Sequence, residues 1–165
     1  MTRKTMIAVA VQIAMMLVGL VSPLAVKTTG TTVYLETQPI DPRALFRGDY
    51  VTLGYSVGES ILSPEMAEES RQTGEPIYVT VTTERPALFV DASFERPEPE
   101  PGQVCLRGRI RRFGDQRTVD FPQIAQYFVA EGEGREIERR LGENLLAEAK
   151  VSGRCNAVLV GLEPR

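Results

Sequence analysis

Residues 41–55 read Asp41-Pro42-Arg43-Ala44-Leu45-Phe46-Arg47-Gly48-Asp49-Tyr50-Val51-Thr52-Leu53-Gly54-Tyr55. This stretch predicts a capped turn followed by a half-buried strand. Asp41 before Pro42 has the form of a helix N-cap followed by proline at the first helical position. A single helical turn over residues 42–46 is therefore expected. Residues 43 and 47 are four apart, so they would share one side of that turn.

The second half of this stretch predicts a strand from Tyr50 to Val57. Gly48 and Asp49 form a tight connection into it, because glycine permits positive φ. Side chains alternate along a strand, so the two tyrosines of the stretch lie on opposite faces. Val51, Leu53 and Tyr55 are expected on the core face, and Tyr50, Thr52 and Gly54 on the other.

Arg43, Arg47, Asp49 and Tyr50 are the candidate binding residues, with two readings of their role. In the first, Asp49 caps the turn and pairs with one of the arginines, which is ordinary turn chemistry. In the second, the two guanidinium forks form a clamp for an anion or for an acidic group of a partner. Both readings remain open from sequence alone.

The N-terminal segment from Met6 to Val26 is apolar and 21 residues long. At about 1.5 Å per residue it spans a hydrocarbon core of roughly 30 Å. Arg3 and Lys4 precede it and Lys27 follows it, so the positive-inside bias predicts a cytoplasmic N-terminus. A cleaved signal peptide is the competing reading, but the apolar run is too long for one. We expect an uncleaved signal anchor over residues 1–27 and one extracytoplasmic domain over residues 28–165.

The charge balance beyond the anchor is acidic. Three of the 19 basic residues flank the apolar segment, which leaves 16 against 22 acidic residues, a formal charge of −6. Nucleic acid as a partner calls for a basic footprint, so it is not expected. Electrostatic docking to anionic lipid is a poor match for the same reason.

The two cysteines, Cys105 and Cys155, form an even set in a chain expected to reach an oxidising compartment. A disulfide between them would stabilise the fold by roughly 4 kcal/mol on the chain-entropy model. Two unpaired buried thiols are the alternative, and the sequence does not decide between these readings.

Apolar and β-branched residues alternate through much of the chain, which favours an α+β, mainly β fold. One small twisted sheet in a partly closed, barrel-like domain is expected. Two helices would interrupt it, over Pro64–Gln72 and, as a long amphipathic helix, over Arg135–Lys150. The Pro-rich stretch over residues 95–102 predicts a stiff hairpin connection. The strands are expected at Val33–Gln38, Tyr50–Val57, Ile77–Thr83, Leu88–Phe94, Val104–Phe113, Ala125–Val129 and Ala157–Leu162.

A second notable block lies ahead of the predicted long helix and is rich in glutamate and glycine. It contains Glu131, Gly132, Gly134 and Glu138. Acidic residues at a helix start oppose the positive end of the helix dipole, so a capping role is one reading. A calcium site is the other, although the spacing of an EF-hand loop is absent. No metal or cofactor is expected.

Catalytic chemistry finds little support in the residue inventory. The chain has no histidine, which excludes a Ser-His or Cys-His arrangement. A Ser-Lys pair needs a nearby lysine, yet the three lysines are Lys4, Lys27 and Lys150, and no serine lies between Val26 and Tyr55. We therefore expect a protein that is not an enzyme.

The stretch Gly48-Asp49-Tyr50 followed by Leu53 and Tyr55 resembles the signature of the GDYXXLXY family of bacterial membrane-anchored proteins. The second block, Tyr127-Phe128-Val129-Ala130-Glu131-Gly132-Glu133-Gly134-Arg135-Glu136-Ile137-Glu138, is similar to that family's second conserved segment. The resemblance implies a single-pass protein of the bacterial cytoplasmic membrane with its C-terminal domain in the periplasm.

Two function classes follow from the resemblance and the residues together. The first is an accessory or scaffolding subunit that binds a multi-pass membrane protein, which the family resemblance favours. Gln12 and Gly19, seven residues apart on the apolar segment, would offer that partner a helix-packing seam. The second is a cell-envelope ligand-binding module whose contact patch is the Arg/Asp/Tyr group of the signature.

Overall fold

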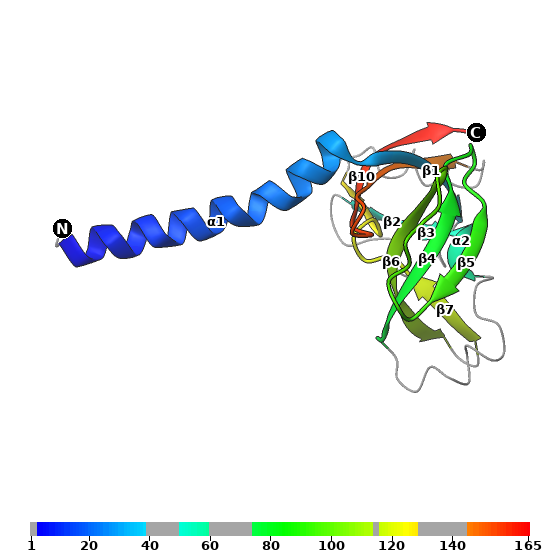
Figure 1. The fold of residues 1–165 in the computed structure, drawn as a ribbon, viewed down its shortest axis with the longest axis horizontal. Coiled ribbons are helices and arrows are strands. Elements are labelled where there is room, and N and C mark those ends of the chain that lie inside the picture. Colours follow the sequence, from blue (N-terminus) through cyan, green and yellow to red (C-terminus); the bar gives the residue numbers. More distant parts are fainter. Residues whose placement is uncertain (1–2, 39–49, 60–73, 114–115, 129–144) are drawn as a thin grey trace.

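The computed structural model describes residues 3–38, 50–59, 74–113, 116–128 and 145–165. Within these ranges a long helix, α1 (Arg3–Thr29), is followed by a body built mainly from strands (Figure 1). The strands are β1 (Thr31–Gln38), β2 (Tyr50–Thr52), β3 (Gly54–Tyr55), β4 (Pro76–Thr82), β5 (Phe89–Ser93), β6 (Gln103–Phe113), β7 (Gln116–Asp120), β8 (Gln126–Phe128), β9 (Leu145–Val151) and β10 (Ala157–Pro164). A short helix, α2 (Ser56–Glu59), directly follows β3.

Helix α1 projects from the β body and exposes its apolar side chains (Figure 1). The segment of this helix from Lys4 to Thr29 is long and apolar enough to cross a membrane, judged by length and composition alone. A helix that is apolar all round has no polar face to turn to water. The helix ends at Thr29, two residues beyond the boundary expected from the sequence.

The strands form two four-stranded sheets and one two-stranded ribbon, and every pairing is antiparallel. The first sheet has the order β10-β9-β1-β3 and the second β5-β4-β6-β7, while β2 and β8 form the ribbon. The mainly β class is confirmed. The partly closed barrel was wrong, because the sheets do not close on one another.

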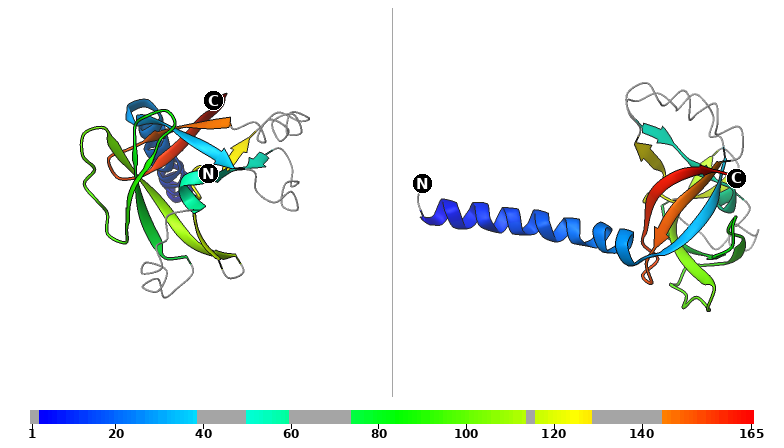
Figure 2. Two further views of the ribbon diagram at one scale, coloured as in Figure 1. Left: turned by 90° about the vertical axis from the view of Figure 1, so that its right-hand side faces the viewer. Right: turned by 90° about the horizontal axis from the view of Figure 1, so that it is seen from above.

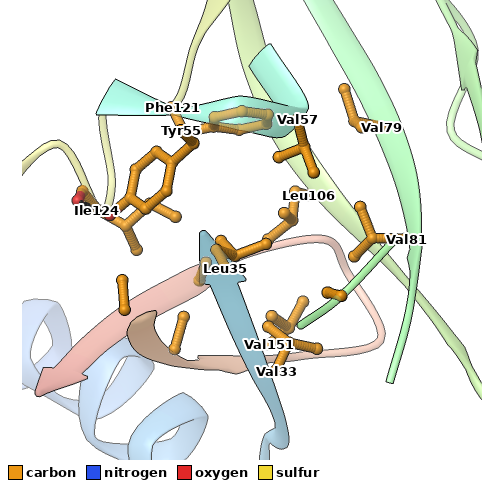
Figure 3. Close-up of a cluster of buried hydrophobic side chains, with 14 of the residues drawn as sticks. Val33, Leu35, Tyr55, Val57, Val79, Val81, Leu106, Phe121, Ile124 and Val151 are labelled. Carbon is orange, nitrogen blue, oxygen red and sulfur yellow. Dashed lines mark hydrogen bonds between the residues drawn. The ribbon is translucent and has the colours of Figure 1, made fainter. Parts of the chain in front are cut away.

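The core lies between the two four-stranded sheets. Val33 and Leu35 of β1 meet Val79 and Val81 of β4 and Leu106 of β6, and all five side chains are buried (Figure 3). Each such aliphatic side chain contributes roughly 1.5–3 kcal/mol when it leaves water. The period-two pattern that predicted β1 and β4 therefore marks the residues that hold the sheets together.

The junction between α1 and β1 is a single residue, Gly30. Its N–H donates to the carbonyl of Val26 over 2.9 Å. A Cβ added at Gly30 would lie 2.5 Å from the Val26 carbonyl oxygen and 3.0 Å from the backbone nitrogen of Val151 on β9. Only glycine lets the helix end approach the sheet this closely. The C-terminal end of the helix thus packs against β9 and β10, and no linker separates the helix from the body.

The structure joins Cys105 of β6 to Cys155 by a disulfide, with a Cα–Cα distance of 4.8 Å. Cys155 lies in the turn between β9 and β10, and its carbonyl accepts a hydrogen bond from the N–H of Arg107 over 3.0 Å. The β9–β10 hairpin belongs to the first sheet and β6 to the second. The bond and this hydrogen bond therefore fasten one sheet to the other.

The prediction of a helix over Arg135–Lys150 was wrong for its last part, because residues 145–150 lie in β9. Leu145 and Ala149, four apart, also fit a strand, since Leu145, Ala147, Ala149 and Val151 all bury one face. Pairing on both sides with β1 and β10 overrides the helix propensity of this Leu/Ala/Glu/Lys sequence. The rest of that helix and the predicted helix over residues 64–72 lie outside the described residues.

The Pro-rich stretch is not a hairpin connection. Strands β5 and β6 flank β4 on its two sides, so they run parallel to each other. The connection must return from the level of Tyr78, opposite Ser93, to the level of Thr82, opposite Gln103, about 14 Å at 3.4 Å per residue. Residues 94–102 can reach about 28 Å at the polyproline rise of roughly 3.1 Å per residue, so they are long enough for this crossover.

Replacing Gly30 by alanine is expected to destabilise the detergent-solubilised protein by about 1–3 kcal/mol, because the new methyl group would meet backbone atoms that have little room to move. The matched control is Gly153→Ala, since no atom lies within 4 Å of a Cβ at Gly153. Thermal melting of both variants checks this. Equal melting temperatures for the two variants would contradict the close approach.

The disulfide predicts that denatured, unreduced protein from cells offers no thiol to an alkylating label. Reduction should lower the melting temperature, because opening a link over 50 residues of sequence frees chain entropy of roughly 4 kcal/mol. The double variant Cys105→Ala/Cys155→Ala should melt at the lower temperature with or without reductant. Two titratable thiols in the unreduced protein would rule the bond out.

Candidate functional site

The two sequence blocks that resemble a family signature meet in one β-ribbon. Strand β2 pairs with β8 in the register Tyr50↔Phe128, Val51↔Tyr127 and Thr52↔Gln126. The ribbon therefore places the start of the second block beside the strand of the first, although 77 residues separate the paired Tyr50 and Phe128. This juxtaposition defines the candidate site.

The strand of the first block changes partners along its length. After β2, the N–H of Leu53 donates to the carbonyl of Ala125 over 2.9 Å. The next two residues form β3, which pairs with the end of β1 through Thr37↔Tyr55 and Gln38↔Gly54. One short segment thus belongs to the ribbon at one end and to the first sheet at the other.

The predicted core face of this segment is confirmed. Val51, Leu53 and Tyr55 are buried, and Thr52 and Gly54 on the opposite face are only partly buried. The signature leucine and second tyrosine therefore serve packing. Tyr55 and Leu53 belong to the same buried cluster as the residues between the two sheets.

Tyr55 is the most tightly held polar group of the site. Its hydroxyl donates to the carbonyl of Ile124 over 2.6 Å, and its ring meets the ring of Phe121 edge-on at 6.0 Å (Figure 3). Burial, and to a lesser degree the negative charge of Asp120, raises the pKa of Tyr55 well above its ordinary range. A phenol that stays protonated and donates inward is unsuited to proton transfer, so Tyr55 fastens the 121–125 segment to β3.

The other predicted site residues are described only in part. Tyr50 is placed by its backbone pairing with Phe128. The remaining candidates of the clamp and turn, and the acidic block, lie outside the described residues: Asp41, Pro42, Arg43, Arg47, Gly48, Asp49, Glu131, Gly132, Gly134 and Glu138. The alternative readings of these residues, turn or anion clamp for the first block and helix capping or calcium site for the second, therefore stay open.

Sequence reasoning did not predict which residues accept hydrogen bonds from the signature strand. Ile124 and Ala125 contribute backbone carbonyls, to Tyr55 and Leu53 respectively, and a carbonyl acceptor leaves no mark on residue type. A weaker signal was present in Pro122, because proline favours the second position of a turn, and the N–H of Ile124 donates to the carbonyl of Phe121 over 3.0 Å across that turn. Among the described residues, no three His, Cys, Asp or Glu side chains gather as a metal site.

Tyr55→Phe is expected to lower the free energy of unfolding by about 1–2 kcal/mol at neutral pH, since it leaves the buried Ile124 carbonyl without its donor. The raised pKa gives the effect a pH dependence. Above the ordinary tyrosine value of 10.0 the unfolded chain releases this proton and the folded protein keeps it, so stability from Tyr55 falls as pH rises.

The stability gap between wild type and Tyr55→Phe should accordingly narrow by about 1.4 kcal/mol per pH unit above about pH 10. Urea unfolding of both proteins at several pH values up to about pH 11 measures it. A gap that stays constant over this range would show that Tyr55 ionises alike in the folded and unfolded states.

The chain was compared with family models, curated proteins and solved structures. The model of the family described as GDYXXLXY protein matches residues 12–162. No curated protein matches the chain, and no solved structure does. The family match covers nearly all of the chain, including both blocks that β2 and β8 bring together, and the chain therefore belongs to the GDYXXLXY family.

Proposed function

We propose that this protein is a single-pass, membrane-anchored accessory or scaffolding subunit that binds a multi-pass membrane protein and has no catalytic activity. The observation that carries the proposal is helix α1, which is exposed and apolar along its length yet packed firmly to the β body at Gly30. An exposed apolar helix of this length is stable in a bilayer, where its side chains contact the lipid tails and its backbone groups are hydrogen-bonded within the helix.

Charge and cysteine chemistry support an orientation for the anchor in a bacterial cytoplasmic membrane. Arg3 and Lys4 precede the apolar stretch, which favours a cytoplasmic N-terminus. The Cys105–Cys155 disulfide fits a domain in the oxidising periplasm. The helix then acts as an uncleaved signal anchor, with residues 28–165 outside the cytoplasm.

The membrane helix offers a seam to a partner helix. Gln12 and Gly19 are two turns apart, and a Cβ at Gly19 would meet no atom of this chain within 4 Å. A glycine with open space beside it allows a second helix to come close, and a glutamine amide can donate to that helix within the lipid. These contacts would hold a multi-pass partner beside α1.

The alternative function is a periplasmic module that binds an envelope ligand through Arg43, Arg47, Asp49 and Tyr50. The observation that favours it is the β2–β8 pairing, which brings both signature blocks to one ribbon. The described part of the signature strand, however, packs into the core through Leu53 and Tyr55. We therefore prefer the scaffolding role.

Affinity purification of the full chain from gently solubilised membranes tests the proposal. A multi-pass membrane protein should copurify in stoichiometric amount. Gly19→Leu should reduce its recovery at least tenfold, because a large side chain blocks the helix seam. Ala14→Leu is the control, since residue 14 lies on another face of α1 and the substitution introduces the same side chain there.

Both variants should keep the melting temperature of the wild-type β domain, because α1 is exposed at these positions. The proposal fails if no multi-pass protein copurifies with the wild type, or if the chain is recovered as a soluble species that starts near Lys27. Equal recovery with Gly19→Leu and Ala14→Leu would exclude the seam.

A further inference from the structure

Strand β5 is an edge strand with an open side. It lies at the end of the sheet order β5-β4-β6-β7 and, within the described part of the chain, pairs only with β4, in the register Tyr78↔Ser93, Val79↔Ala92 and Thr80↔Asp91. Among the described residues, no backbone hydrogen bond joins residues 89–93 to any segment other than β4. Every second peptide group of β5 therefore points its N–H and C=O away from the sheet.

The entry to this open strand is apolar and exposed. Leu88, Phe89 and Val90 are 54%, 45% and 41% exposed, although they follow one another in the sequence. Edge strands are normally protected by lysine, proline, a β-bulge or a covering segment, because an open apolar edge invites pairing with another chain. The other sheet ends differently, since its edge strand β10 carries Glu163 and Pro164. In β5 the register shifts between Thr80↔Asp91 and Val81↔Phe89, which makes Val90 the extra residue of a bulge, while residues 91–93 pair regularly with β4. The regular part of the β5 edge beside this bulge is therefore suited to receiving a strand.

The position of β5 decides between possible occupants. In Figure 1 β5 lies on the side of the body away from α1, and in Figure 2 (left) the green strands face the viewer with α1 behind them. The bilayer that would hold α1 thus lies on the opposite side. A two-fold dimer through β5 would also place its two α1 helices at opposite ends, where both cannot enter one membrane. The remaining occupant is a segment of a different protein.

The charged residues near the edge indicate which charge the partner segment should carry. Residues 84–100 contain five carboxylates, Glu84, Asp91, Glu95, Glu98 and Glu100, against the two guanidiniums of Arg85 and Arg96. Arg85 is already engaged, since it donates to Glu163 over 2.9 Å and stacks on the ring of Tyr34. The chain on both sides of β5 therefore carries an excess of negative charge, and a basic segment complements it.

We propose that the open edge of β5 binds an extended segment of a partner protein as an added strand, and that this segment combines apolar side chains with flanking lysine or arginine. Main-chain hydrogen bonds to β5 give the affinity, and contacts with Leu88, Phe89 and Val90 together with the acidic surroundings give the selectivity. The inference rests on the proposed scaffolding function and names how the periplasmic part of the partner is held.

Photo-crosslinking in intact cells tests the inference. A photoreactive phenylalanine analogue replaces Phe89 in the full-length, membrane-inserted chain, and the adducts are mapped to individual residues by mass spectrometry. The same analogue at Val160, which is exposed on the edge strand β10, is the matched control. The expected result is an adduct from position 89, absent from position 160, within a Lys/Arg-flanked apolar segment of another protein.

Val90→Lys in the same chain should lower the yield of that adduct at least tenfold, because it adds a charge of the same sign as the segment at the open edge. Its melting temperature should match that of the wild type, since Val90 is exposed and outside the core. An adduct with a second copy of this chain or with lipid, an adduct in a segment without basic residues, no adduct, or a yield unchanged by Val90→Lys would each overturn the inference.

The two proposals fail separately. If a multi-pass protein copurifies through α1 but position 89 gives no such adduct, the edge inference falls and the scaffolding role stands. If the adduct maps to a basic segment but no multi-pass protein copurifies with the wild type, the scaffolding role falls and the strand-accepting edge remains.

Discussion

The missing side chain of Gly30 is the constraint on which the arrangement of the molecule depends. Because there is no Cβ, the end of α1 lies against the backbone of Val151, and no flexible linker separates the helix from the sheet. From β9 the connection continues through the β9–β10 turn to Cys155, whose disulfide reaches β6 of the second sheet. The orientation of α1 thereby fixes the orientation of both sheets.

The signature segment makes a second connection between separate parts of the fold. Residues 50–55 pair with β8 at one end and with β1 at the other, and the Tyr55 hydroxyl secures the 121–125 segment between them. The described part of the signature thus connects the first sheet to the β2–β8 ribbon. This connection explains why apolar and aromatic residues stand at these spacings in residues 51–55.

Local alternation was sufficient to predict β1, β4 and β6, because each buries one face against the core, and it also predicted β10, in which Ala157 is buried and Leu159 and Leu162 are partly buried. It failed where one pattern fits both a strand and a helix, as in β9, whose buried Leu145 and Ala149 also have the fourfold spacing of a helix face. Strand β7 was missed because its sequence is polar, with Val119 as its buried apolar residue. Its signal was the two-residue link Gly114-Asp115 between the paired Phe113 and Gln116. Sheet order and the crossover after β5 are long-range properties that no local pattern contains.

The central proposal is that α1 and the β domain form one rigid unit on a membrane. The β9–β10 turn lies on the α1 side of the domain (Figure 2, right) and would face the lipid, while β5 would face away from it. A nitroxide label at position 154 in that turn and, in a separate sample, at position 90 measures this in liposomes. A relaxation agent attached to lipid headgroups should broaden the signal from position 154 strongly and leave that from position 90 as in bulk water. Equal broadening at both positions would contradict the account, because it would mean that the domain tumbles freely about the helix end.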